Sequence, residues 1–135
     1  MTAQEIFDTV ARHLVVQGKP AFSDYGPVQS CNYRAPDGSK CAIGCLITDE
    51  EYGEEFEGTS VLGVLSMHPG LDARLGPHVD LLVHLQDAHD WFLYDFSAPY
   101  TNYANFPAWE NQMRVVAERF GLSAESMGRD NSNQI

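Results

Sequence analysis

The chain has 135 residues, of which 44% are hydrophobic and 11% aromatic, and such a chain folds as one globular domain. Its formal net charge of −11 argues against direct binding to nucleic acid or to anionic membranes, since both attract basic surfaces. No stretch approaches the ~18 apolar residues of a membrane span, and no secretion signal is visible at the N-terminus. With three cysteines and no such signal, we expect reduced thiols in a cytoplasm, and a monomer or small homo-oligomer.

The N-terminal segment has the clearest helix pattern in the chain. Thr2 and Glu5 have the spacing of a capping box, in which each side chain bonds the other residue's backbone amide. The apolar residues that follow share one helical face: Ile6, Phe7, Val10, Ala11 and Leu14. Gly18 supplies a C-terminal stop and Pro20 forbids continuation. The sequence therefore predicts an amphipathic helix ending at Gly18.

The stretch 31–47 holds all three cysteines and the strongest turn signal. Pro36-Asp37-Gly38 favours a tight turn, because proline fixes the first turn angle and glycine accepts a positive φ. Two short strand-like segments, 28–34 and 39–43, flank this turn and predict an antiparallel hairpin. Residues 43–47 either extend the second strand or open a short helix, and Gly44 leaves both alternatives open.

Three further helices are predicted downstream. A short one, capped by Thr59 or Ser60, runs through Met67 and is ended by Pro69-Gly70. A longer one begins near Pro77 and runs to about Phe96, with His89 in the middle of its apolar face. The last begins near Pro107 and ends at Gly121; its apolar seam is Trp109, Met113, Val116 and Phe120.

These elements predict an α+β fold, mainly helical with a small antiparallel β-hairpin or sheet. We expect a single compact domain over residues 1–122 and a polar, frayed tail over 123–135. Irregular surface loops are expected at 48–58 and 97–106.

The cysteines allow two chemical interpretations. The spacing Cys31-x9-Cys41-x3-Cys45 does not match common zinc modules, so we predict no metal site and no cofactor. Cys41 follows Lys40, which favours a reactive thiolate. A thiol-dependent site would use Cys41 as nucleophile, His89 as base and Arg34 to hold an anionic group. The nearby acids oppose a thiolate.

Burial is the alternative interpretation of the same residues. A free cysteine behaves as a small hydrophobe, and a histidine on an apolar helix face is more often a buried ring bonded to a backbone group or carboxylate. On a regular helix Asp90 projects away from the direction of His89, so the two are not expected to form a dyad.

Two surface features favour protein binding instead. Residues 49–57 hold six acids, with no lysine or arginine between Lys40 and Arg74, which predicts a strong local negative field. The acids are Asp49, Glu50, Glu51, Glu54, Glu55 and Glu57. Residues 91–109 hold 8 of the chain's 15 aromatic side chains. Four lie outside the helix seams and either pack a loop onto the core or form a binding surface: Trp91, Tyr94, Tyr100 and Tyr103.

The order of these motifs resembles a group of small proteins encoded by phages and prophages. The similarity spans roughly Gln4 to Leu122; its most specific part runs from Tyr33 to Gly44, followed by Leu85-Gln86-x-x-His89-Asp90. The resemblance implies a phage-associated product acting in a bacterial cytoplasm. It brings no established activity.

We therefore expect a protein that acts by binding a host or phage protein with a basic surface, as an inhibitor of a host defence or nucleic-acid-handling system such as CRISPR interference. The alternative is a thiol-dependent hydrolase or transferase using Cys41 and His89.

Overall fold

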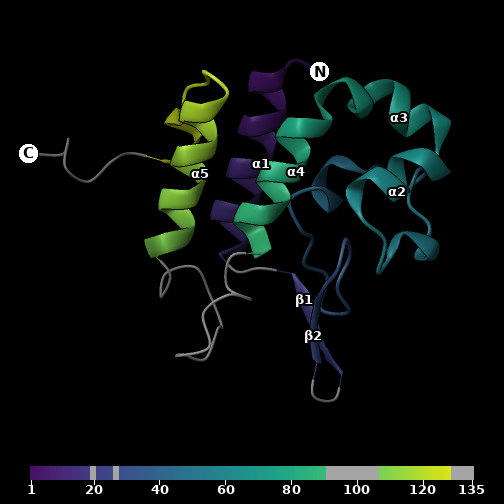
Figure 1. The fold of residues 1–135 in the computed structure, drawn as a ribbon. Helices are drawn as coiled ribbons and strands as arrows, with labels where there is room; N and C mark the ends of the chain where they lie inside the picture. Colours follow the sequence, from purple (N-terminus) through teal and green to yellow (C-terminus); the bar gives the residue numbers. More distant parts are fainter. Residues whose placement is uncertain (19–20, 26–27, 91–106, 129–135) are drawn as a thin grey trace, which may run out of the picture.

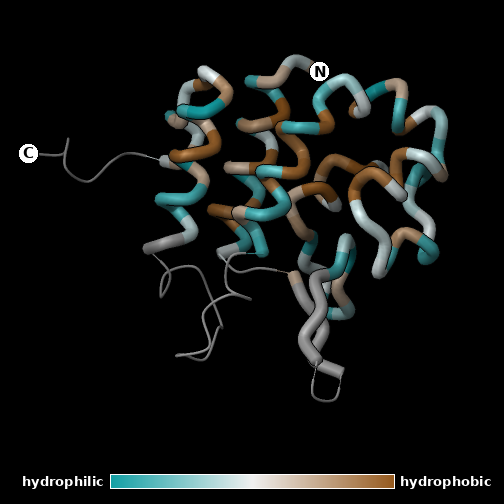
Figure 2. The backbone as a smooth tube through the Cα atoms, viewed as in Figure 1, coloured by the Kyte–Doolittle hydropathy of each residue, from teal (hydrophilic) through white to brown (hydrophobic). Residues whose placement is uncertain are grey.

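The computed structural model describes residues 1–18, 21–25, 28–90 and 107–128. Three helices form its main layer (Figure 1): α1 (Ala3–Gln17), α4 (Val79–His89) and α5 (Pro107–Arg119). α4 contacts α1, α5 and α2 (Val61–Met67), and α3 (Pro69–Leu75) packs on α2. Apolar positions gather where these helices face one another (Figure 2). Within the described ranges, no helix has both the length and the apolar character needed to cross a membrane.

The predicted N-terminal helix is confirmed. Thr2 Oγ1 accepts the Glu5 amide at 3.1 Å, and Glu5 Oε1 accepts the Thr2 amide at 2.8 Å, so two amides that the helix leaves free are satisfied. Gly18 ends α1 with φ 72°, a left-handed conformation that favours glycine. All five predicted apolar residues of α1 are buried.

The C-terminal helix is also confirmed. Trp109, Met113 and Val116 are buried, and Phe120 packs partly buried beside them. Gly121 has φ 67° and donates to the Glu118 carbonyl, while the Leu122 amide bonds the Ala117 carbonyl at 2.8 Å. These two bonds form a Schellman cap, which occupies the last free carbonyls of the helix.

The central helix begins close to the predicted position. The single turn η3 (Gly76–His78) contains Pro77 and leads directly into α4. Leu81, Leu82, Leu85 and His89 are buried on one face, as the periodicity predicts. Residues 91–96 of the predicted helix, and the predicted loop 97–106, lie outside the described residues.

The predicted α+β class is wrong: the described part of the chain is mainly helical, and no sheet forms a layer of its core. The strands β1 (Phe22–Tyr25) and β2 (Val28–Cys31) make only a two-stranded antiparallel ribbon, which projects from the helices (Figure 1). The predicted hairpin between 28–34 and 39–43 does not form, because 28–31 pairs with the segment before it. An isolated bridge joins Arg34 to Lys40.

A side chain explains why the predicted strand stops. The amides of Tyr33 and Arg34 both donate to the Glu57 carboxylate, so these groups are unavailable to a strand ladder. The tight turn itself is confirmed: Gly38 has φ 91°, and Asp37 Oδ1 accepts the Ser39 amide at 2.9 Å. Beyond it, residues 44–46 form the single turn η1 (Gly44–Leu46). This segment therefore opens a short helical turn and does not extend the second strand.

The predicted short helix, capped at Ser60 and running through Met67, is confirmed, and a second helix that the sequence does not predict follows it. α2 is capped by Ser60, whose hydroxyl accepts the Gly63 amide, but α3 begins at Pro69 itself. His68 Nδ1 accepts the Leu71 amide at 3.0 Å, and proline suits the first position of a helix, where its missing N–H costs nothing. Pro69 therefore follows the end of α2 and also begins α3.

Packing continues past the predicted domain boundary at residue 122. Gln4 exchanges two hydrogen bonds with the backbone of Ser123, at 3.0 and 2.9 Å. The single turn η6 (Glu125–Met127) then packs on α1 and buries Met127. One apolar side chain thus anchors the segment as far as Met127. Residues 129–135 lie outside the described residues.

Gly44→Ala should destabilise the fold, although the backbone of Gly44 has an ordinary φ. A Cβ there would lie 2.0 Å from the Tyr33 carbonyl oxygen, so backbone must move, at a cost of about 1–3 kcal/mol. Gly70→Ala is the matched control, since its Cβ would meet only the His68 ring at 3.2 Å. Urea unfolding should show a clear loss for Gly44→Ala alone; equal stability of the two variants would contradict the close approach.

Candidate functional site

The carboxylate of Glu57 joins two segments of the chain. It accepts hydrogen bonds from the Tyr33 and Arg34 amides at 2.9 and 3.0 Å and from the Tyr52 hydroxyl at 2.6 Å, with Asn32 Nδ2 at 3.4 Å. Burial and this bond to Glu57 raise the pKa of Tyr52 to about 12. Glu57 is therefore an internal acceptor and not one of the outward-facing acids that the sequence predicts.

Arg34 is held in place by groups of the chain itself. Its guanidinium lies over the Tyr52 ring, 4.4 Å from the centroid, and donates to the Ile47 carbonyl at 3.2 Å. It also forms an ion pair with Asp49 at 2.8 Å. A guanidinium with these partners stiffens the segment around Tyr52. It does not present a separate anion site beside Cys41.

His89 is fully buried, with 0% exposure, and both ring nitrogens are bonded. Nε2 accepts the Ala21 amide at 2.9 Å, so that nitrogen carries no proton, and Nδ1 donates to Asp90 Oδ1 at 2.7 Å. The expectation that the two residues do not pair is wrong. Asp90 is the C-cap of α4, and its carboxylate reaches back to the ring of the residue before it.

Cys41 is buried as well. Its thiol has 0% exposure, and Sγ accepts the Gly44 amide at 3.2 Å. Burial raises the pKa of Cys41 to about 12, with the Asp90 carboxylate acting in the same direction; burial also raises the pKa of Cys45 to about 12. A thiol with so high a pKa holds almost no thiolate at neutral pH. These observations favour the burial interpretation of Cys41.

The predicted acidic segment divides into anchored and outward acids. Glu51 pairs with Arg74, and Asp49 pairs with Arg34 while keeping 83% of its side chain exposed. Glu50, Glu54 and Glu55 are exposed, and no described cation pairs with them. The predicted aromatic surface of Trp91, Tyr94, Tyr100 and Tyr103 lies outside the described residues.

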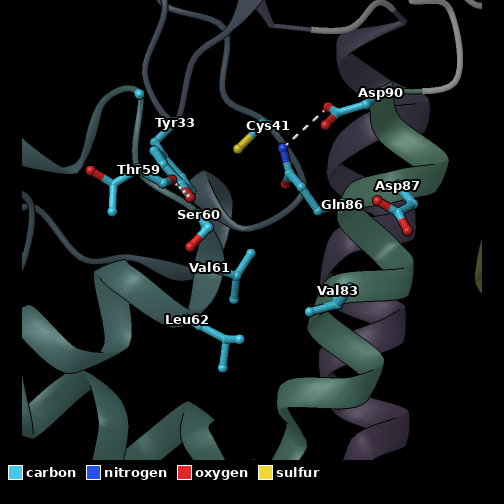
Figure 3. A pocket seen from close by; sticks show the side chains of 11 residues that line it. Tyr33, Cys41, Thr59, Ser60, Val61, Leu62, Val83, Gln86, Asp87 and Asp90 are labelled. Atoms are coloured by element: carbon cyan, nitrogen blue, oxygen red, sulfur yellow. Dashed lines mark hydrogen bonds between the residues drawn. The ribbon is translucent and has the colours of Figure 1, made fainter. Parts of the chain in front are cut away.

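A pocket of about 450 Å³ opens between α2 and α4, and Tyr33 and Cys41 also line it (Figure 3). Val61 and Leu62 line one side, and α4 supplies Val83, Gln86, Asp87 and Asp90 on the other. Gln86 Nε2 donates to Asp90 Oδ1 at 3.2 Å. Sequence reasoning missed this site, although Gln86 and Asp90 belong to the motif Leu85-Gln86-x-x-His89-Asp90.

The described residues contain no group of three or more histidine, cysteine or acidic side chains placed to hold a metal ion. Comparison of the chain with protein-family models, with curated proteins and with solved structures finds no match. These comparisons therefore give no support to a phage-related assignment or to an inhibitor of CRISPR interference.

Glu57→Gln should destabilise the protein by about 1–3 kcal/mol, because a neutral amide replaces a charged acceptor of two buried amides and turns an N–H₂ group toward donors. Urea unfolding measures this loss, and Glu55→Gln, on an exposed acid of the same segment, is the matched control. The Tyr52 pKa should fall toward its ordinary value in Glu57→Gln, seen as phenolate absorption. An unchanged free energy of unfolding would contradict the claim that the Glu57 carboxylate stabilises the fold.

Cys41 should resist alkylation in the folded protein. At pH 7.5 iodoacetamide should label it at least about a hundredfold more slowly than in the urea-unfolded chain, since a buried thiol with a raised pKa is both inaccessible and protonated. Peptide mapping by mass spectrometry separates Cys41 from Cys31 and Cys45. Rapid labelling of Cys41 before unfolding would instead support the thiol-dependent enzyme.

Proposed function

We propose that this protein acts by binding a partner protein with a basic surface, through an acidic face formed by Glu50, Glu54 and Glu55. The observation that carries the proposal is that these three carboxylates are exposed and that no described cation neutralises them. Outward charges of one sign raise the rate of encounter with an oppositely charged partner and favour that partner over others.

The surrounding contacts give the acidic face a fixed shape. Thr48 and Glu51 bond each other's amides in a capping arrangement, at 2.9 and 3.3 Å, and Arg74 Nη2 donates to the Leu46 carbonyl at 2.8 Å. Glu54 and Glu55 lie on the single turn η2 (Glu54–Phe56), whose Phe56 is buried. Charges on such a frame lose little conformational freedom on binding, which supports the proposed interface.

The alternative, a thiol-dependent hydrolase or transferase, has less support. Its nucleophile would be the buried Cys41, and its base would be His89, whose Nε2 already accepts the Ala21 amide. A general base needs a free lone pair within reach of the proton that it removes. We therefore place the function at the acidic face and not at the thiol.

Reversing the charge of the acidic face should abolish partner capture. The variant Glu50→Lys/Glu54→Lys/Glu55→Lys is compared with Glu110→Lys/Glu118→Lys/Glu125→Lys, which makes the same change in net charge at exposed acids elsewhere. Immobilised wild-type protein and the control should retain the same lysate protein at low salt and lose it as salt rises. The acidic-face variant should fail to retain it.

Capture that is lost equally in both triple variants would show that net charge alone acts, and would contradict a specific face. Recovery of no partner by the wild-type protein at low salt would contradict the proposal altogether. All six substituted residues are exposed, so each variant should remain folded. Circular dichroism of the three proteins checks this.

A further inference from the structure

The pocket between α2 and α4 has the size and lining of a small-molecule site. Its volume of about 450 Å³ lies within the range of roughly 300–1,000 Å³ that is usual for ligand pockets. One side is apolar: Val61 and Leu62 face Val83 across the space (Figure 3). Leu62 is 63% exposed, an uncovered leucine at the rim of a hollow into which an apolar ligand would fit.

The opposite end of the pocket is negative. Asp87 and Asp90 both line it, and the lining contains no lysine, arginine or histidine. Asp90 Oδ1 receives both described hydrogen bonds to that carboxylate, from His89 and Gln86, and no described residue donates to Oδ2. Asp87 is exposed; partial desolvation and the neighbouring Asp90 raise its pKa, while His84 acts in the opposite direction.

We propose that this pocket binds a small organic cation: a primary or secondary amine carried on an alkyl chain or a single ring. The ammonium group lies between Asp87 and Asp90, where it forms charge-assisted hydrogen bonds. The apolar body lies between Val83 and the α2 residues Val61 and Leu62, where it covers apolar surface that is otherwise wet. A neutral ligand of the same shape gains only the second contribution, and an anion is repelled.

The chain itself positions the Asp90 end of this pocket. His89 and Gln86 both bond Oδ1 of the Asp90 carboxylate, and Gln86 Oε1 in turn accepts the Ile43 amide at 3.3 Å. Across the pocket, the Tyr33 hydroxyl donates to the Thr59 carbonyl at 2.5 Å. These bonds hold the walls in place without a ligand, so little ordering accompanies binding. The inference does not depend on the acidic face.

The test uses phenethylamine as the cation, 2-phenylethanol as its neutral counterpart and 3-phenylpropionate as the anion. Each is titrated into the ¹⁵N-labelled full chain and followed through the backbone amides. Phenethylamine should shift amides of residues 59–62 and 83–90 in a saturable manner. 2-Phenylethanol should bind at least about tenfold more weakly, the weight of one charge-assisted bond, and 3-phenylpropionate should not bind.

Two pairs of variants locate the site. Asp90→Asn should weaken phenethylamine at least about tenfold, while Asp80→Asn, on the exposed side of the same helix, should leave it unchanged. Since Asp90 also bonds His89, a second pair avoids any effect on folding: Leu62→Gln should weaken binding and Met67→Gln, at an exposed position of α2 away from the pocket, should not.

Equal affinity for phenethylamine and 2-phenylethanol would overturn the cation preference. Shifts confined to residues 48–57, or an affinity that Leu62→Gln and Asp90→Asn both leave intact, would place the amine outside the pocket and overturn the site.

Discussion

The carboxylate of Glu57 is the interaction on which the arrangement of this protein depends. It accepts two backbone amides that a β-strand would otherwise use, and it also accepts the Tyr52 hydroxyl. A half-buried carboxylate is stable only when donors replace the water it loses, so its position and the positions of its donors fix one another. The bend at Tyr33 and Arg34 follows from this, and with it the rear wall of the pocket and the frame that carries the acidic face.

His89, at the end of α4, is a second buried side chain that accepts a backbone amide. A leucine would fill its place on the apolar face, but it would leave the Ala21 amide without an acceptor inside the protein. The ring meets that need with Nε2 and uses Nδ1 to orient Asp90. One buried side chain thus fastens the segment that follows α1 and also aims a carboxylate into the pocket. His89 and Asp90 therefore form a structural pair that fixes the position of a negative charge.

Local patterns explain the elements that could be predicted from the sequence. The capping box at Thr2, the apolar periodicity of α1 and α5 and the glycines that end both helices act over a few residues, and these predictions are confirmed. The hairpin prediction was wrong because Glu57, more than twenty residues away, decides where the strand at 28–34 ends. The helix α3 was not predicted, because the cap from His68 that lets Pro69 begin a helix has no clear sequence pattern. Cys41 and His89 were predicted as a reactive pair, whereas Cys41 instead lines a pocket with Gln86 and Asp90, residues that only the fold brings together.

The bonds between Gln4 and Ser123 join positions 119 residues apart. The outer side of α1 is covered by the segment ending at Met127, so during synthesis the first helix leaves the ribosome long before its last partner does. Closing a loop of this length lowers the conformational entropy of the chain before the stabilising contacts form. A ribosome-bound chain therefore carries α1 with part of its surface uncovered until the segment ending at Met127 has been synthesised.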